Sequence, residues 1–312
     1  MYQGFLPINK PVGMRSAGCV ERVKRILGRG VKVGHGGTLD STASGVLVLL
    51  LGGATRLSSF VMLMPKIYRA VVKLGVETTT CDYSGESVKE GDAGGVTDEN
   101  LDAVIPSFMG WRMQVPPEVS AVRVGGRRAH EIFRSGGAPD IEPRPVFIEN
   151  IRRVGSISEN REVELLIRCG KGTYIRSLAR DIGRRIGCYA HIASLEREAV
   201  GPFTLKNALS PDGNSEAGDH IEQAILPIDF LGAFLPRYMI GRDDERALSA
   251  GREIPISRAE RMTSGDYCPD STVLATGRSL ITVGSIKASG GTVMIKPQVN
   301  IERTVSSAGH RR

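Results

Sequence analysis

The chain has 312 residues, of which 41 are Lys or Arg and 34 are Asp or Glu, so its formal charge is +7. A hydrophobic share of 41% excludes a disordered chain, and the longest apolar run, Val46 to Leu51, is too short for a membrane span of about 20 residues. The first residues lack a secretory signal pattern and the length suits about two domains, so we expect a two-domain cytoplasmic protein.

Two helices are expected early in the chain. Apolar residues at helical spacing over 20–27 predict a helix that Ser16 caps and that ends at Gly28. A second helical pattern, over 101–108, lies behind Asp98.

Strict alternation of apolar and polar residues predicts two strands. Over 66–75 the apolar residues share one face, and Tyr68 lies on that face near the start of the strand. A second alternation, over 162–169, leads into a short glycine turn, after which the period becomes helical over 175–186. Another face of that helix is basic and is expected to point into solvent; it consists of Arg176, Arg180 and Arg184.

Two breaks in composition divide the rest of the chain. Residues 207–221 are polar and rich in turn formers, so they are expected to form an exposed loop. From about residue 237, short β segments separated by Gly-rich turns predict a small barrel or sandwich, with a domain boundary near 234–238. Residues 304–312 are expected to form a frayed basic tail.

The five cysteines and five histidines are widely spaced. The cysteines form no CxxC pair and the histidines form no HExxH motif. This spacing argues against a disulfide framework and against a zinc site, so we expect no metal and buried free thiols. The thiols are those of Cys19, Cys81, Cys169, Cys188 and Cys268.

A glycine-rich loop over 33–46 holds Asp40 and His35 directly before the apolar run. Glycines let backbone approach a ligand closely, but the loop lacks the Walker A and GxGxxG patterns of phosphate-binding loops. No nucleophilic triad pattern is present, and spacing alone neither supports nor excludes a glycosidase-type carboxylate pair. Asp40 is therefore a candidate catalytic group or a helix cap, and His35 a candidate pocket residue or a packing residue.

Six short segments match, in order, the motifs of one known family. They are LPINKPVG over 6–13, GHGGTLD over 34–40, KIYR over 66–69, QVPPEVSA over 114–121, GTYIR over 172–176 and AH at 190–191. Together, across about residues 4–235, they resemble the TruB family, the bacterial tRNA pseudouridine-55 synthases. The chain departs from the family pattern at Ser41, where proline is usual, and in the length of the loop over 207–221.

The resemblance implies that the protein isomerises a uridine of the tRNA T-loop, at position 55, to pseudouridine. The reaction needs no cofactor, since a single carboxylate suffices. Asp40 is then the catalytic residue, by attack on the sugar C1′, by addition to the base or by abstraction of the C2′ proton. The base must leave its stack to react, so Tyr68 would stack on the flipped uridine and relay the C5 proton, while Leu195 would close the other side of the pocket.

Other residues acquire roles through the same resemblance. Arg176 would pair with the catalytic carboxylate, and Tyr174 would support the pocket by hydrogen bonding. His35 would fill the space that flipped nucleotides vacate. Three basic clusters are candidate phosphate contacts that position the RNA. They are Lys24, Arg25, Arg29 and Lys32; Arg123, Arg127, Arg128 and Arg134; and Arg180, Arg184 and Arg185.

The implied fold class is α+β: a mixed, largely antiparallel sheet with helices in a catalytic domain over 1–236, then a small PUA-like RNA-binding β-barrel over 237–303. The catalytic domain would carry an RNA-binding insertion over about 114–152. The expected partner is the T-stem-loop of tRNA, with no membrane and no obligatory protein partner, and the protein is expected to be a monomer. Two alternatives stay open: a pseudouridine synthase for another RNA, and a noncatalytic tRNA-binding or RNA-folding protein.

Overall fold

The computed structural model describes residues 2–28, 30–210, 217–263 and 272–303. Its larger sheet has the strand order β1-β3-β12-β4-β11-β10-β7, with β2 paired to β3 and β13 to β12. The strands are β1 Gly4–Lys10, β2 Val33–His35, β3 Ser44–Leu51, β4 Lys66–Leu74, β7 Gly110–Gln114, β10 Arg144–Val154, β11 Glu162–Cys169, β12 Ala190–Val200 and β13 Phe203–Thr204. Within this sheet β3 and β12 are parallel and the other pairings are antiparallel, so the predicted mixed, largely antiparallel sheet is confirmed.

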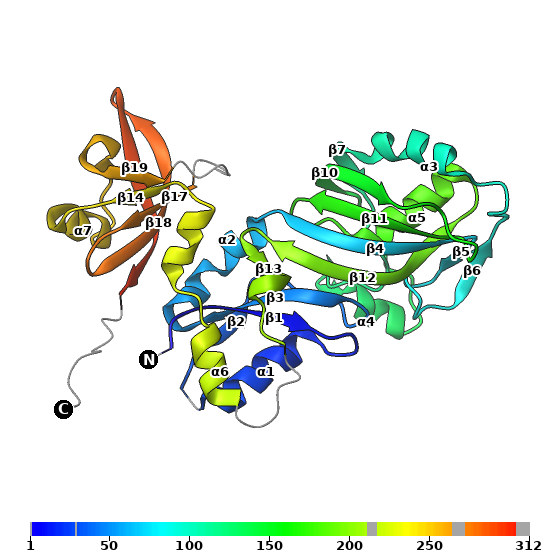
Figure 1. Ribbon diagram of the computed structural model, residues 1–312, viewed down its shortest axis with the longest axis horizontal. Helices are drawn as coiled ribbons and strands as arrows, with labels where there is room; N and C mark the ends of the chain where they lie inside the picture. The colour runs from blue at the N-terminus through cyan, green and yellow to red at the C-terminus, as the bar shows by residue number, and fades with distance from the viewer. Residues whose placement is uncertain (1, 29, 211–216, 264–271, 304–312) are drawn as a thin grey trace.

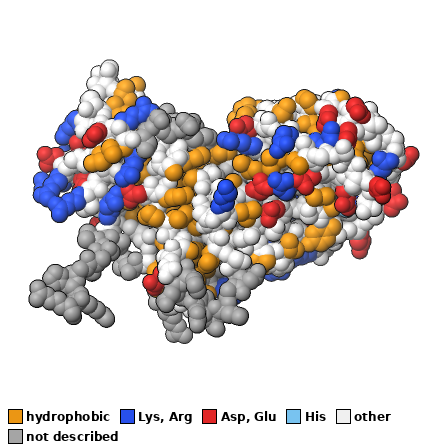
Figure 2. Space-filling model, in the orientation of Figure 1, with side chains coloured by type: hydrophobic (Ala, Val, Ile, Leu, Met, Phe, Trp, Pro, Cys, Tyr) orange, Lys and Arg blue, Asp and Glu red, His pale blue; other side chains and the backbone are white. Residues whose placement is uncertain are grey.

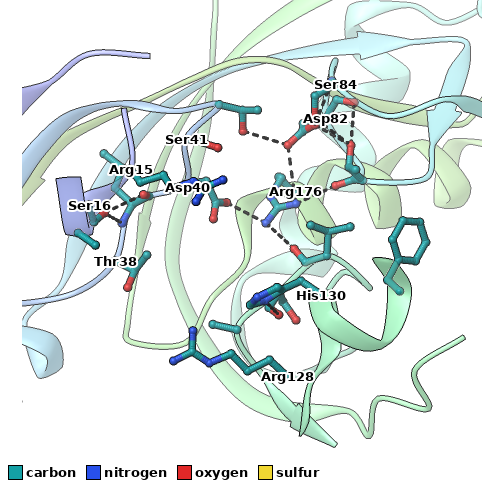
Figure 3. A pocket seen from close by; sticks show the side chains of 18 of the residues that line it. Arg15, Ser16, Thr38, Asp40, Ser41, Asp82, Ser84, Arg128, His130 and Arg176 are labelled. Atoms are coloured by element: carbon teal, nitrogen blue, oxygen red, sulfur yellow. Dashed lines mark hydrogen bonds and ion pairs between the residues drawn. The ribbon is translucent and has the colours of Figure 1, made fainter. Parts of the chain in front are cut away.

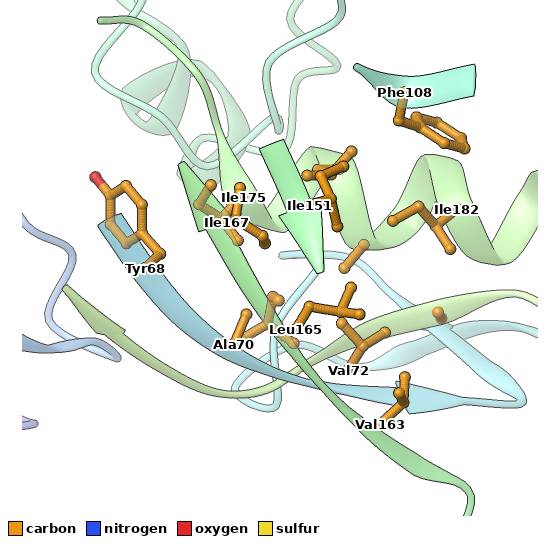
Figure 4. Packing of buried hydrophobic residues seen from close by; sticks show 14 of the residues in the cluster. Tyr68, Ala70, Val72, Phe108, Ile151, Val163, Leu165, Ile167, Ile175 and Ile182 are labelled. Carbon is orange, nitrogen blue, oxygen red and sulfur yellow. The ribbon is translucent and has the colours of Figure 1, made fainter. Parts of the chain in front are cut away.

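One face of the sheet carries the largest hydrophobic core. The predicted alternation in β4 and β11 is present, and the inward residues pack beneath α5, Ile175–Ile186. Figure 4 shows Ile175 and Ile182 of this helix above Val72 and Leu165 of the two strands. Tyr68 lies at the end of the cluster with its hydroxyl directed away from the other labelled side chains. The same core therefore positions both the start of α5 and the start of β4.

The arginines of α5 do not form a solvent-directed face. Arg176 is 5% exposed and Arg180 is 9% exposed, so the prediction for these two is wrong. The carbonyls of Val115 and Val119 accept hydrogen bonds from them, which shows that the segment after β7 covers this side of the helix. Helical periodicity identifies the face that meets the sheet but cannot report a second layer laid over the other face.

Two predicted helix ends also differ. The helix α1, Ser16–Leu27, ends at Gly28 as predicted, but Arg15 occupies the cap position and Ser16 is buried inside the first turn. The helix α3, Asp98–Val104, continues only as a 3-10 turn over Ile105–Phe108. Pro106 explains the change, since it has no N–H to donate to a continued α-helix.

The predicted loop over 207–221 is partly helical. Residues 211–216 lie outside the described residues, but α6 runs over Ala217–Ala224, and Ile221 is 3% exposed. Ile221 shares a hydrophobic core with α1, β1 and β3, so its apolar side chain anchors the second half of the segment. The tail over 304–312 lies outside the described residues as well.

A second sheet follows residue 236 and has the strand order β15-β19-β18-β17-β14-β16. The strands are β14 Arg237–Met239, β15 Ile254–Pro255, β16 Glu260–Thr263, β17 Thr272–Thr276, β18 Leu280–Ser289 and β19 Thr292–Glu302, and α7 Arg242–Ser249 packs on them. Figure 1 shows this C-terminal sheet at one end of the molecule and the larger sheet at the other. Closure of the C-terminal sheet into a PUA-like barrel stays a prediction.

The C-terminal sheet shares a core with the rest of the chain. Val273 packs within the C-terminal unit, whereas its neighbour Leu274 belongs to the cluster that contains Phe5 and Phe203. Both side chains are fully buried, on opposite sides of β17. The two sheets are therefore joined by apolar packing and not only by the chain that connects them.

Four of the expected buried thiols are confirmed as free and buried: Cys19, Cys81, Cys169 and Cys188. Cys268 lies outside the described residues.

Over the described ranges, no helix is long and apolar enough to cross a membrane.

Candidate active site

Asp40 lies on the loop that connects β2 to β3. Hydrogen bonds from Ser16 and Lys10 fix the backbone of this loop. The Ser16 hydroxyl accepts from the Leu39 N–H at 2.9 Å and donates to the Leu39 carbonyl at 2.9 Å. The ammonium of Lys10, a fully buried residue, donates to the Ala43 carbonyl at 2.6 Å. The Asp40 side chain stays 42% exposed, so the loop presents a carboxylate to solvent on a fixed backbone.

The loop is hydrogen-bonded to a neighbouring segment at Ser41, which replaces the proline usual in the family. Its carbonyl accepts from the Gly13 N–H at 2.7 Å, and its side chain is exposed. The next residue, Thr42, donates from its hydroxyl to Asp82 at 3.0 Å.

Arg197 holds the other side of the loop and was not among the predicted site residues. Its guanidinium donates to three carbonyls: that of Val46 at 2.7 Å, that of Thr38 at 3.1 Å and that of Gly37 at 3.2 Å. Arg197 is 2% exposed and lies on the same inward face of β12 as the apolar Leu195 and Ala199. The sequence signal for Arg197 was its position: it is a charged residue in the same alternation as the apolar residues Leu195 and Ala199.

Gly45 allows this approach of β12 to β3. Its φ is +108°, and a Cβ there would lie 2.3 Å from the Arg197 carbonyl oxygen. Any other residue would push apart the parallel strands that bring Arg197 under the loop.

Arg176, in the first turn of α5, connects Asp40 to two other segments. Its Nη2 lies 2.9 Å from the Asp40 carboxylate and 3.0 Å from the Val119 carbonyl. Its Nη1 donates to the Thr80 carbonyl at 2.9 Å and lies 3.7 Å from the carboxylate of Asp82. Figure 3 shows Arg176 between the two carboxylates. The predicted pairing of Arg176 with Asp40 is thus present as a buried cation beneath an exposed anion.

Asp82 completes this arrangement and was also not predicted as a site residue. It is 3% exposed and lies just beyond β5, Val76–Thr78, in the connection to β6, Ser87–Glu90. Burial alone would raise the pKa of Asp82, but hydrogen bonds from Ser84 and Thr80 and the charge of Arg176 lower it. Asp82 is therefore an anion that fixes Arg176 from the side opposite Asp40.

Asp40 and Arg176 border a cavity of about 730 Å³ at the end of the larger sheet. Three further predicted residues line it: Tyr68, Tyr174 and Leu195. Tyr68 and Leu195 come from the adjacent strands β4 and β12. Burial raises the pKa values of both Tyr68 and Tyr174. The cavity thus combines an aromatic ring and an aliphatic side chain with an exposed carboxylate.

Two buried cations belong to the wall of this cavity. Lys66 and Arg197 both line it. Burial, with the neighbouring charge of Arg197, lowers the pKa of Lys66 to about 8. The environment therefore favours a ligand that carries negative charge.

A second cavity, of about 910 Å³, lies on the other side of Asp40 and Arg176. His35 lines this second cavity and not the first. Burial and the charge of Arg197 lower the pKa of His35. The predicted residues thus divide between two spaces that meet at Asp40.

One wall of the second cavity is formed by the segment that connects β7 to β10, residues 115–143. It contains the ribbon of β8, Arg123–Val124, and β9, Arg127–Arg128, followed by α4, Ala129–Arg134. Figure 3 shows Arg128 and His130 of this segment across the cavity from Asp40. Cations that line the cavity are Arg15, Arg123, Arg128, Arg134 and Arg176.

Two of the three arginines in the predicted basic cluster of α5, Arg180 and Arg184, form ion pairs within the protein, whereas Arg185 is exposed. The guanidinium of Arg184 bonds to Glu77 at 2.5 and 2.7 Å, and Arg180 pairs with Asp181 at 2.9 Å. These two arginines neutralise carboxylates of the protein itself. In the cluster around Arg123, three arginines line the second cavity together with Asp40: Arg123, Arg128 and Arg134.

A carboxylate of this kind can act as a nucleophile or as a base without a metal or a redox partner. The aromatic ring and the flanking cations suit a planar, polyanionic substrate such as a nucleotide within RNA.

Three comparisons agree with this geometry. The TruB family pseudouridylate synthase N-terminal domain matches residues 24–175. A tRNA pseudouridine synthase B of Bartonella tribocorum is 39% identical over 272 residues, 81% of this chain and 84% of that protein. One of Rhodococcus jostii is 40% identical over 254 residues, covering 80% and 81% of the two chains. The crystal structure of a Cbf5-Nop10-Gar1 complex contains a chain with a TM-score of 0.69 and 25% identity, covering 96% of this chain and 84% of that one.

The fold and these comparisons identify a pseudouridine synthase, an isomerase. The chain belongs to the TruB family of these enzymes. The enzyme class predicted from the sequence motifs is confirmed.

Proposed function

We propose that the protein converts the uridine at position 55 of the tRNA T-loop to pseudouridine, with Asp40 as the catalytic carboxylate. One observation carries the proposal: Asp40 is exposed at the junction of two cavities and is paired at 2.9 Å with the buried Arg176. The similar proteins named tRNA pseudouridine synthase B support tRNA as the substrate.

The reaction breaks the N1–C1′ bond, turns the base and joins C5 to C1′. The C5 proton is lost and N1 gains one, so atoms and electrons balance without an added reactant. In this proposal the uridine leaves the stack and enters the smaller cavity between Tyr68 and Leu195. Arg176 stabilises the negative charge of Asp40 beside the sugar, and Tyr68 relays the proton from C5.

The larger cavity accommodates the RNA that surrounds the target. Arg15, Arg123 and Arg128 would contact phosphates there, which position RNA without selecting a sequence. His35 would occupy the space of displaced nucleotides, and Tyr174 would support the smaller cavity.

We assign the C-terminal sheet to RNA binding, as a PUA-like unit. Figure 2 shows Lys and Arg side chains over this end of the molecule. Arg242, Arg252, Lys287 and Lys296 are exposed there. The proposed enzyme is a cytoplasmic monomer that needs no protein partner.

The test is a purified reaction on unmodified tRNA. We expect pseudouridine at position 55 of the T-loop and at no other uridine, mapped by carbodiimide labelling and primer extension. A transcript with cytidine at position 55 is the matched control and should gain no pseudouridine. If pseudouridine formed only in another RNA, that RNA would be the substrate. If the protein bound tRNA but formed no pseudouridine in any RNA, it would be a noncatalytic RNA-binding protein.

Tyr68 separates stacking from proton transfer. Tyr68→Phe keeps the ring and loses the hydroxyl, so this variant should bind tRNA like the wild type but fail to complete turnover. Tyr68→Leu loses the ring as well, and its tRNA affinity should fall by about 1–3 kcal/mol per lost base stack. Affinity is measured by filter binding and product by single-turnover assay.

An active Phe variant with a defective Leu variant would limit Tyr68 to stacking. Full activity in both variants would show that Tyr68 is a core residue of β4 and not part of the reaction pocket.

A further inference from the structure

An aromatic platform lies on the solvent side of the larger sheet at its β7 edge. Trp111, the chain's single tryptophan, is 76% exposed, and Met113, two residues further on β7, is 60% exposed. Phe147 of β10 is 36% exposed and lies opposite Trp111 in the strand register. The Trp111 and Phe147 ring centroids are 5.4 Å apart, with the planes inclined at 47°. These three adjoining apolar side chains form one exposed patch, and contiguous exposed apolar patches are a feature of interaction sites.

The platform is continuous with the wall of the smaller cavity. Pro145 lies opposite Met113 in the strand register and also lines the cavity. The Gly170 N–H donates to the Phe147 carbonyl at 2.8 Å, and Gly170 lines the cavity too. A strand of RNA leaving the reaction pocket by this side would thus pass over Trp111.

Charge on this rim suits RNA. Two cations that line the cavity lie close in sequence to the platform: Arg144 and Lys171. Both are exposed, and neither forms an ion pair with a residue in the described part of the chain. The exposed carboxylate of Glu149 is paired at 2.8 Å with Arg168. Exposed rings beside unpaired cations are the elements that bind single-stranded nucleic acid by stacking and phosphate contact.

We propose that Trp111, supported by Phe147 and Met113, stacks on an unpaired nucleobase of the RNA substrate outside the reaction pocket. Trp111 is then a positioning residue that helps to seat the RNA, and it does not touch the reacting atoms. The proposal rests on the proposed function for the identity of the RNA, but stacking itself is observable without turnover.

The experiment uses the full chain and the fluorescence of its single tryptophan. Titration with a T-stem-loop RNA should quench Trp111 emission with the same midpoint as filter binding. Trp111→Ala should weaken RNA binding about tenfold, since a stacked base contributes about 1–3 kcal/mol. The loss should appear in KM rather than in kcat, and Trp111→Phe should restore most of it. Val88→Ala, at a 51% exposed apolar residue on β6, is the matched control and should bind normally.

Emission that does not respond to RNA, or a Trp111→Ala variant with wild-type affinity, would overturn the proposal. Emission that depends on protein concentration without RNA would assign the platform to contact between copies and would overturn it as well. A wild-type protein that makes no pseudouridine in tRNA contradicts the proposed function, whereas quenching by RNA tests the platform independently.

Discussion

Replacing Asp40 with asparagine should abolish pseudouridine formation while leaving the fold and RNA binding nearly intact. The asparagine side chain can still accept a hydrogen bond from Arg176, which lies 2.9 Å from the carboxylate in the wild type. It cannot act as a nucleophile or base, so the single-turnover rate should fall by a factor on the order of 10⁴ or more, as when an enzyme loses its nucleophile. Affinity should hold because phosphate contacts dominate RNA binding.

Asp102→Asn is the matched control for this variant. The Asp102 side chain, on α3, is 51% exposed and pairs with Arg153 at 2.6 Å, so this variant also removes an exposed carboxylate from an ion pair with an arginine. Its rate should equal that of the wild type. Substantial turnover by Asp40→Asn under single-turnover conditions would remove Asp40 from the catalytic role, and tritium release from 5-tritiated uridine in the RNA would reveal even slow product formation.

Arg176 should be the second most sensitive position, because one buried guanidinium contacts both Asp40 and Asp82. Arg176→Met leaves Asp82 buried without a cation, which should lower the free energy of unfolding by about 3–5 kcal/mol. Arg176→Lys keeps the charge but cannot reproduce the fork of bonds to the Thr80 and Val119 carbonyls. The Lys variant should therefore fold, and its turnover should fall by about 10²–10³-fold, the scale on which the loss of one preorganised hydrogen-bond donor lowers kcat.

Urea unfolding and single-turnover assays separate the two effects. Arg185→Lys, at an exposed position on the same helix, is the control and should change neither. A Lys variant at position 176 with the wild-type rate would show that Arg176 only stabilises the fold.

Two central strands of the larger sheet and the helix that follows them can be predicted because their signals are local. Alternation identifies β4 and β11, and a change of period identifies α5 within one residue of its ends. The residues that the motifs single out are found together: Tyr68 and Leu195 both face the cavity that Asp40 borders. These predictions hold because side-chain period follows directly from backbone geometry.

The supporting residues of the site were less accessible to prediction. Asp82 and Arg197 support the site through contacts with segments remote from them in sequence, the loop before β3 and the start of α5. Ser16 is typical of a helix cap in sequence, whereas its hydroxyl bonds to Leu39 in the loop that holds Asp40. A polar side chain of this kind can form hydrogen bonds with its sequence neighbours or with a distant segment. The neighbouring sequence therefore does not show which of these partners it has in the fold.

The sequence by itself determined the family, the positions of β4, β11 and α5, and the change to short strands after residue 236, and it singled out Asp40 as the candidate catalytic carboxylate. Only the tertiary structure decided that Arg176 is buried beneath Asp40, that the segment after β7 covers α5, and that the C-terminal sheet shares its core with β1 and β3. The physical reason is that periodicity reports which face of an element is buried against one neighbour, whereas a second covering layer and a buried ion pair depend on which distant segments the topology brings together.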